Sequence, residues 1–82
     1  MNIKILGIGC PKCRALEKRV RETVAEAGVT AVVEHVNDFK EIAGYGVLST
    51  PAVVVDGEVK SVGKIPKKEE ILTWLESGVQ HD

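Results

Sequence analysis

Ile3-Lys4-Ile5-Leu6-Gly7-Ile8-Gly9-Cys10-Pro11-Lys12-Cys13 is the stretch that decides the fold. Its first six residues are mostly apolar and predict a short buried strand, and Pro11 favours the first turn of a helix. The two cysteines are the only ones in the sequence, and they fall where this strand runs into the helix. Two thiols three residues apart at such a junction can open and close a disulfide.

The helix start gives the two cysteines different expected roles. Cys10 falls at or beside the N-cap, where unpaired backbone N–H groups and the positive end of the helix dipole favour a thiolate. Lys12 and Arg14 add positive charge there, so we expect Cys10 to be the nucleophile. Cys13 lies one turn further along on the apolar face, so we expect it to be the shielded, resolving thiol. That face continues through Leu16, Val20, Val24 and Ala27.

Length and composition indicate one small globular unit. The 82 residues, 44% hydrophobic and 28% charged, predict a single domain over residues 1–78 with a frayed tail, Val79 to Asp82. A net charge of -1 and few aromatic residues argue against a nucleic-acid partner. The sequence has no apolar run of the roughly 20 residues that span a bilayer, so no membrane contact is expected and the cytoplasm is the expected location. In that reducing compartment, a close cysteine pair favours redox catalysis or metal binding over a structural disulfide.

The first half of the chain predicts two helices and two strands. A helix over Pro11 to Ala27 should end at Gly28, and a strand over Thr30 to Val36 should lie at an edge beside the first strand. Asn37 or Asp38 can cap a short helix. Phe39, Ile42 and Ala43 should lie on one face of that helix. We interpret His35 as a surface residue of the edge strand.

The second half predicts a hairpin and a final helix. Ala52 to Val55 is a continuous apolar run, typical of a strand buried on both faces. Asp56-Gly57 is a strong turn signal before a strand over Glu58 to Val62, in which polar and apolar residues alternate. Pro66 announces the last helix. We expect its buried residues to be Ile71, Leu72 and Leu75, with Trp74 at the margin of the core. The predicted class is α/β, in the order β-α-β-α-β-β-α.

Three motifs in this order resemble the thioredoxin-like superfamily, and within it the small archaeal and bacterial redox-disulfide proteins of glutaredoxin size. The resemblance covers nearly the whole chain. It implies a four-stranded mixed sheet flanked by helices. The motifs are Gly7-Ile8-Gly9-Cys10-Pro11-Lys12-Cys13, Ser49-Thr50-Pro51-Ala52-Val53-Val54-Val55-Asp56-Gly57 and Val62-Gly63-Lys64.

The resemblance also implies a substrate-binding surface. A proline at the position of Pro51 forms a cis peptide beside the cysteines in this family, and the backbone of the preceding residue, here Thr50, pairs with an incoming substrate strand. Pro11, Lys12 and Gly63 are assigned to the same surface.

Three features depart from the family pattern. Gly9 stands where thioredoxins commonly have tryptophan before the first cysteine. No acidic residue lies between Met1 and Cys10 to act as the buried proton shuttle, so Lys4, a water molecule or a substrate group could deprotonate Cys13. Gly63 is followed by Lys64 instead of a second glycine and an acid, so efficient glutathione binding is not expected.

The expected function is thiol-disulfide exchange between the Cys10-Cys13 pair and the disulfides of client proteins, with the chain acting as a reductant. A separate disulfide reductase would recycle the pair, and no other cofactor is expected. The alternative is binding or transfer of a soft metal, Cu(I) or zinc, because ferredoxin-like metal carriers also place two cysteines after their first strand. Those carriers end on a strand, whereas this chain should end on a helix.

Overall fold

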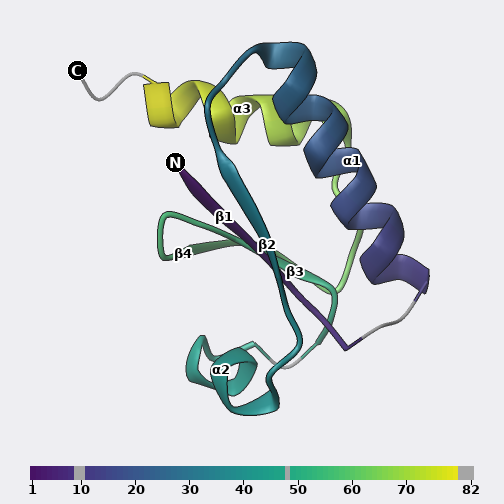
Figure 1. The fold of residues 1–82 in the computed structure, drawn as a ribbon. Helices are drawn as coiled ribbons and strands as arrows, with labels where there is room; N and C mark the ends of the chain where they lie inside the picture. The colour runs from purple at the N-terminus through teal and green to yellow at the C-terminus, as the bar shows by residue number, and fades with distance from the viewer. Residues whose placement is uncertain (9–10, 48, 80–82) are drawn as a thin grey trace.

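The computed structural model describes residues 1–8, 11–47 and 49–79. Their elements follow the predicted order, and Figure 1 shows their arrangement. These are β1 (Asn2–Leu6), α1 (Pro11–Ala27), β2 (Val32–Val36), α2 (Phe39–Gly44), β3 (Ala52–Val55), β4 (Glu58–Val62) and α3 (Lys68–Val79). The predicted α/β class is confirmed. Of the expected frayed tail, Val79 ends α3, and residues 80–82 lie outside the described residues.

The four strands form one mixed sheet in the order β2-β1-β3-β4. β1 is parallel to β2 and antiparallel to β3, and β4 is antiparallel to β3. β2 therefore lies at an edge beside β1, as predicted. Helices α1 and α3 cover one face of this sheet, and α2 lies on the other side (Figure 1).

The pleat of β1 divides the hydrophobic core between the two faces. Ile3 and Ile5 pack with residues of α1 and α3, whereas Leu6 packs with Ile42 of α2. Successive side chains of a strand point to opposite faces, so these two clusters lie on either side of the sheet. All four residues of β3 are buried, which confirms the predicted two-sided burial of this strand.

The helices bury most, but not all, of the predicted residues. In α1, Leu16 and Val20 are fully buried, but Ala27, the last residue of the helix, is exposed. Thr23 is buried in addition. Its hydroxyl donates to the Arg19 carbonyl oxygen at 2.7 Å, so its polar atom is satisfied within the helix.

The short helix α2 buries only one of the three residues expected on its apolar face. Asp38 is its N-cap, and its side chain accepts hydrogen bonds from the backbone N–H groups of Lys40 and Glu41. Ile42 is buried, but Phe39 is 74% exposed and Ala43 is also exposed. A helix of six residues makes fewer than two turns, so it presents little more than one position to the sheet.

The hairpin between β3 and β4 turns at Asp56 and Gly57, as predicted. Their φ values are 49° and 84°, the pair of positive angles that a tight type I′ turn requires. A register shift between Val53 and Val54 breaks the expected alternation along β4, so that Ser61 is buried and Val62 is 44% exposed. In α3, Ile71 and Leu75 are buried, and Leu72 and Trp74 pack against the core as partly buried residues.

Candidate functional site

Cys13 lies in the first turn of α1, and its side chain is fully buried. Its sulfur lies directly against the backbone of Gly7, just past the end of β1. A Cβ atom built on Gly7 would be 2.2 Å from Cys13 Sγ and 3.2 Å from Cys13 Cβ. Any side chain at position 7 would therefore occupy the space of the sulfur. This arrangement agrees with the expectation that Cys13 is the shielded thiol.

Pro51 belongs to the same cluster. Its peptide bond with Thr50 is cis, and the residue is buried. The Pro51 Cα atom is 4.0 Å from the Cβ position of Gly7, so β1, α1 and the segment before β3 meet around the Cys13 sulfur. Cys10 lies outside the described residues.

Gly63, directly after β4, is hydrogen-bonded to the segment that contains Pro51. Its backbone N–H donates to the Pro51 carbonyl oxygen at 2.8 Å, and its φ of 73° is a conformation that favours glycine. A Cβ atom at Gly63 would approach Ser49 Cβ at 3.2 Å. Gly63 therefore fits closely against the loop that carries Thr50 and Pro51, and its role in substrate binding stays a prediction.

The other predicted substrate-binding residues are exposed. Pro11 and Lys12 form the exposed start of α1, and Thr50 is exposed beside the buried Pro51. Among the described residues, none makes a hydrogen bond with the backbone of Thr50. The role of Thr50, Pro11 and Lys12 in substrate binding stays a prediction.

His35 is exposed, as predicted for a surface residue, but it also makes contacts that the prediction did not include. Its Nε2 atom lies 2.9 Å from the Gly7 carbonyl oxygen, and its Nδ1 atom lies 3.4 Å from Glu17 Oε1. Arg21 holds the other oxygen of Glu17 at 2.9 Å and donates to the Val33 carbonyl oxygen at 3.1 Å. These groups connect α1 and β2 to the residue that contacts the Cys13 sulfur.

The partners of the His35 ring define its hydrogen-bonding state. A carbonyl oxygen only accepts hydrogen bonds, so the Nε2 atom facing Gly7 carries a proton. The other nitrogen, Nδ1, lies beside the Glu17 carboxylate. The sequence spacing gives no sign of this contact, because residues 7, 17 and 35 meet through the packing of α1 on a parallel strand pair.

Lys4 is placed away from Cys13. It alternates with Ile3 and Ile5, whose side chains point to the face covered by α1, so Lys4 belongs to the face of α2. There its ammonium group lies 3.5 Å from Glu41 and over the ring of Tyr45. Tyr45, with a smaller contribution from Glu41, raises the pKa of Lys4 above its usual value. The sheet thus separates Lys4 from Cys13, which argues against Lys4 as the proton acceptor.

The described residues contain no group of three or more histidine, cysteine, aspartate or glutamate side chains placed to hold a metal ion. In the same part of the chain, no helix is long and apolar enough to cross a membrane.

Comparison with known proteins identifies the family. Residues 1–76 match the family model of the thioredoxin domain. The chain is 42% identical over 71 residues to a thioredoxin of Methanothermobacter thermautotrophicus, an alignment that covers 87% of this chain and 92% of the relative. It is 43% identical over 75 residues to a thioredoxin of Methanocaldococcus jannaschii, covering 92% of this chain and 86% of the relative. These matches give the metal-binding alternative no support. The chain therefore belongs to the thioredoxin family and is a thiol-disulfide oxidoreductase.

Proposed function

We propose that Cys10 and Cys13 carry the exchange, and that the chain reduces disulfides of client proteins. The observation that carries this proposal is the position of Cys13: a buried thiol in the first turn of α1, against Gly7 and close to Pro51. A second cysteine precedes it by three residues in the sequence. This spacing gives an attacking thiol and a shielded partner that can close a ring with it.

In the proposed reaction, the Cys10 thiolate attacks one sulfur of a client disulfide. A mixed disulfide forms, and the second client sulfur leaves as a thiolate that takes up a proton. Cys13 then loses its proton and attacks the Cys10 sulfur, which forms the Cys10-Cys13 disulfide and releases the first client sulfur. Two electrons pass from the cysteine pair to the client. A disulfide reductase would return them, and the cycle needs no further cofactor.

The surface around Pro51 supports an extended segment of a client as the substrate. No described residue makes a hydrogen bond with the backbone of Thr50, so this backbone could pair with such a segment as a strand partner would. Ile8, which follows Gly7, is 52% exposed, and Val62, which precedes Gly63, is 44% exposed. Both side chains could cover the apolar part of a bound segment. The cytoplasm is the proposed location, because a reductant needs its cysteine pair to be kept reduced.

A redox titration of the metal-free protein in dithiothreitol buffers tests this function. Mass spectrometry should show a reversible loss of two hydrogens, with both cysteines protected from alkylation in the oxidised form. We expect a midpoint of about -200 to -270 mV, the range of glutaredoxins and thioredoxin. Thiols that stay unpaired across the titration, or that become protected only when copper or zinc is added, would overturn the proposal.

Trapping assigns the roles of the two cysteines. The Cys13→Ser variant should accumulate mixed disulfides through Cys10, because the second step is blocked. The matched Cys10→Ser variant should accumulate far fewer, since its remaining thiol is buried. Equal trapping by the two variants would contradict the assignment of Cys10 as nucleophile.

A further inference from the structure

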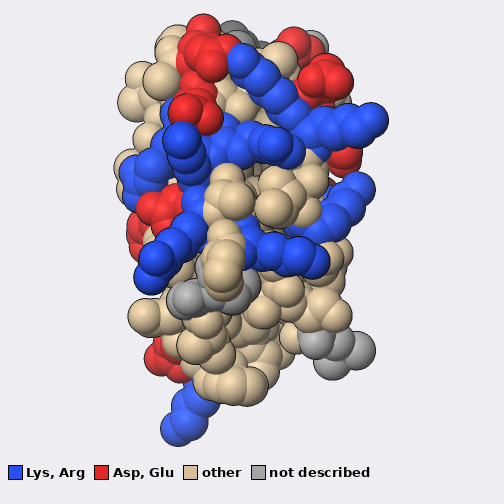
Figure 2. All heavy atoms as spheres, turned by 90° about the vertical axis from the view of Figure 1, so that its right-hand side faces the viewer, with Lys and Arg blue, Asp and Glu red and all other residues tan. Residues whose placement is uncertain are grey.

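The positive charge of this chain is concentrated at the start of α1. Residues 11–21 carry five basic side chains and one carboxylate, a net charge of +4, whereas the rest of the chain carries six basic and eleven acidic side chains, a net charge of -5. The overall charge of -1 therefore hides a strong asymmetry. Figure 2 shows lysine and arginine side chains gathered across the middle of the face that α1 presents.

The charges in the first turn of α1 have the opposite sign to those usually found at the start of a helix. Acidic residues stabilise the first turn, where the helix dipole is positive. The other two helices follow this rule, with Glu41 in the first turn of α2, and Glu69 and Glu70 in that of α3. The first turn of α1 has no acidic residue and instead contains Lys12 and Arg14. Among the three helices of the described residues, only α1, which carries Cys13, lacks an acidic residue in its first turn.

Most lysines elsewhere in the described chain are neutralised by a carboxylate. Four ion pairs do this: Lys4 with Glu41, Lys60 with Glu58, Lys64 with Glu70, and Lys68 with Glu26. On α1, by contrast, four cations have no carboxylate within 4.0 Å among the described residues: Lys12, Arg14, Lys18 and Arg19. Arg19 donates to the Pro66 carbonyl oxygen at 3.0 Å instead. The other three are thus uncompensated along the exposed first half of this helix.

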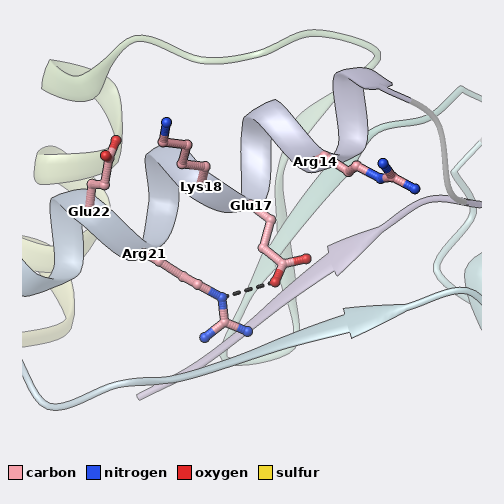
Figure 3. A pocket seen from close by; sticks show the side chains of 5 residues that line it. All are labelled: Arg14, Glu17, Lys18, Arg21 and Glu22. Carbon is pink, nitrogen blue, oxygen red and sulfur yellow. Dashed lines mark hydrogen bonds and ion pairs between the residues drawn. The ribbon is translucent and has the colours of Figure 1, made fainter.

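Arg14 and Lys18 belong to a groove on the outer side of α1. The groove has a volume of about 360 Å³, and Figure 3 shows the five side chains that line it. They are Arg14, Glu17, Lys18, Arg21 and Glu22. Glu17 and Arg21 point toward each other, while Lys18 and Glu22 extend to the other side of the helix (Figure 3). Glu17 is already held by Arg21 and His35. Of the three other lining charges, Arg14 and Lys18 are positive and Glu22 is negative, so the groove keeps one net positive charge.

Stabilisation of the Cys10 thiolate does not explain all three uncompensated cations. Lys12 and Arg14 lie close enough to the helix start to stabilise that thiolate. Lys18 is seven residues beyond Pro11, about 10 Å along the helix axis. That separation exceeds the Debye length of about 8 Å at physiological ionic strength, so Lys18 contributes little to a charge at the helix start.

We propose that the basic ridge of Arg14 and Lys18 docks an acidic segment of the client protein beside its disulfide. The proposal rests on the proposed function and adds the chemistry of the partner. An aspartate- or glutamate-rich segment would fill the groove while the disulfide reaches the start of α1. Attraction of this kind raises association rates and depends strongly on salt.

Three synthetic disulfide peptides provide the test. They share one sequence and differ only in three residues beside the disulfide, which are aspartate, serine or lysine. The reduced protein is mixed with each peptide, and the second-order rate of peptide reduction is measured at 20 mM and 500 mM NaCl. At low salt we expect the acidic peptide to react about tenfold faster than the basic one, and at high salt less than twofold faster.

Matched variants locate the effect on α1. The Arg14→Gln/Lys18→Gln variant should bring the low-salt preference down to about twofold. The Lys40→Gln/Lys60→Gln variant removes the same charge from α2 and β4 and should keep the tenfold preference. The rate with the serine peptide corrects for any change in thiol reactivity. An equal loss in both variants would overturn the proposed site, since only net charge would then matter.

The serine peptide also separates the two proposals. If wild-type protein fails to reduce it, the proposed function itself fails. If the protein reduces all three peptides at equal rates, only the docking proposal fails. The last experiment adds a single-stranded oligonucleotide as a competitor. If it strongly inhibits the reaction while the protein shows no preference among the peptides, the ridge binds nucleic acid, and the proposal of an acidic protein partner is overturned.

Discussion

The Cys13 sulfur rests on the bare backbone of Gly7, so closely that an added methyl group would lie 2.2 Å from it. Both partners are buried. A Gly7→Ala change must therefore displace the sulfur or move the first turn of α1 away from the sheet. We expect this overpacking to cost about 1–3 kcal/mol of stability in the reduced protein, measured by urea denaturation. Alkylation of Cys13 in the native state should become faster, since the thiol loses its cover.

Gly44→Ala is the matched control for that change. Gly44 ends α2, and nothing lies within 4 Å of a Cβ atom placed there. The same methyl group should leave stability unchanged or raise it by about 0.4–1 kcal/mol, because it restricts the unfolded chain. A Gly7→Ala protein with wild-type stability and a still protected Cys13 would contradict the close contact.

The contact of His35 with Glu17 should add to the stability of the folded chain. The Nδ1 atom of His35 on β2 lies 3.4 Å from Glu17 Oε1 on α1. A double-mutant cycle with Glu17→Gln and His35→Gln should give a coupling energy of about 0.3–1 kcal/mol.

Arg21 must be kept in that cycle, because it is the other charged group that holds Glu17. Urea denaturation of the wild type, the two single variants and the double variant measures the coupling energy. A value close to zero would contradict the contact.

Local signals in the sequence account for most of the fold. The helix Pro11–Ala27 and the strand Glu58–Val62 have the predicted bounds, because proline, glycine and the Asp56-Gly57 turn act within a few residues. Ala27 lies on the face of α1 predicted to be buried but is exposed, and Phe39, on the expected apolar face of α2, is exposed too. Their burial depends on which neighbours the sheet provides, and periodicity within one element does not contain that information.

The candidate site shows the same difference between features set within one element and contacts between elements. Burial of Cys13 follows from the apolar face of its own helix and could be predicted. The contacts of Gly7 with Cys13 and of His35 with Gly7 join separate elements, and they arise only when α1 packs on the β1–β2 pair. The strand register and the helix position set these distances, and neither is encoded in residue spacing.

Removal of two buried hydroxyl groups should change the stability of the protein in different directions. Within the described residues, Ser61 Oγ is buried without a hydrogen-bond partner, so Ser61→Ala should keep stability or raise it by up to about 1 kcal/mol. Thr23 Oγ1 donates to the Arg19 carbonyl oxygen at 2.7 Å, so Thr23→Val should cost about 0.5–1.5 kcal/mol. Urea denaturation of the two variants measures both values. A destabilised Ser61→Ala protein would mean that this hydroxyl has a partner in solution.

Lys4 should affect stability but not thiol chemistry. Tyr45 and then Glu41 raise its pKa, so its protonated form is favoured in the folded chain. A raised pKa gives stability that is fully present at neutral pH and is lost as the pH rises through the folded-state value, above 10.5. Lys4→Met should therefore be less stable than wild type at pH 7, and the difference should close at strongly alkaline pH.

The same Lys4→Met variant should leave the pH dependence of cysteine alkylation unchanged, because the sheet lies between Lys4 and Cys13. Alkylation of each cysteine is followed by mass spectrometry across pH 5–10, and Glu41→Gln serves as the control that removes the carboxylate partner of Lys4. A shifted alkylation profile in Lys4→Met but not in Glu41→Gln would mean that the lysine reaches the thiols after all. An unchanged profile would leave a water molecule or a group of the client to accept the proton of Cys13.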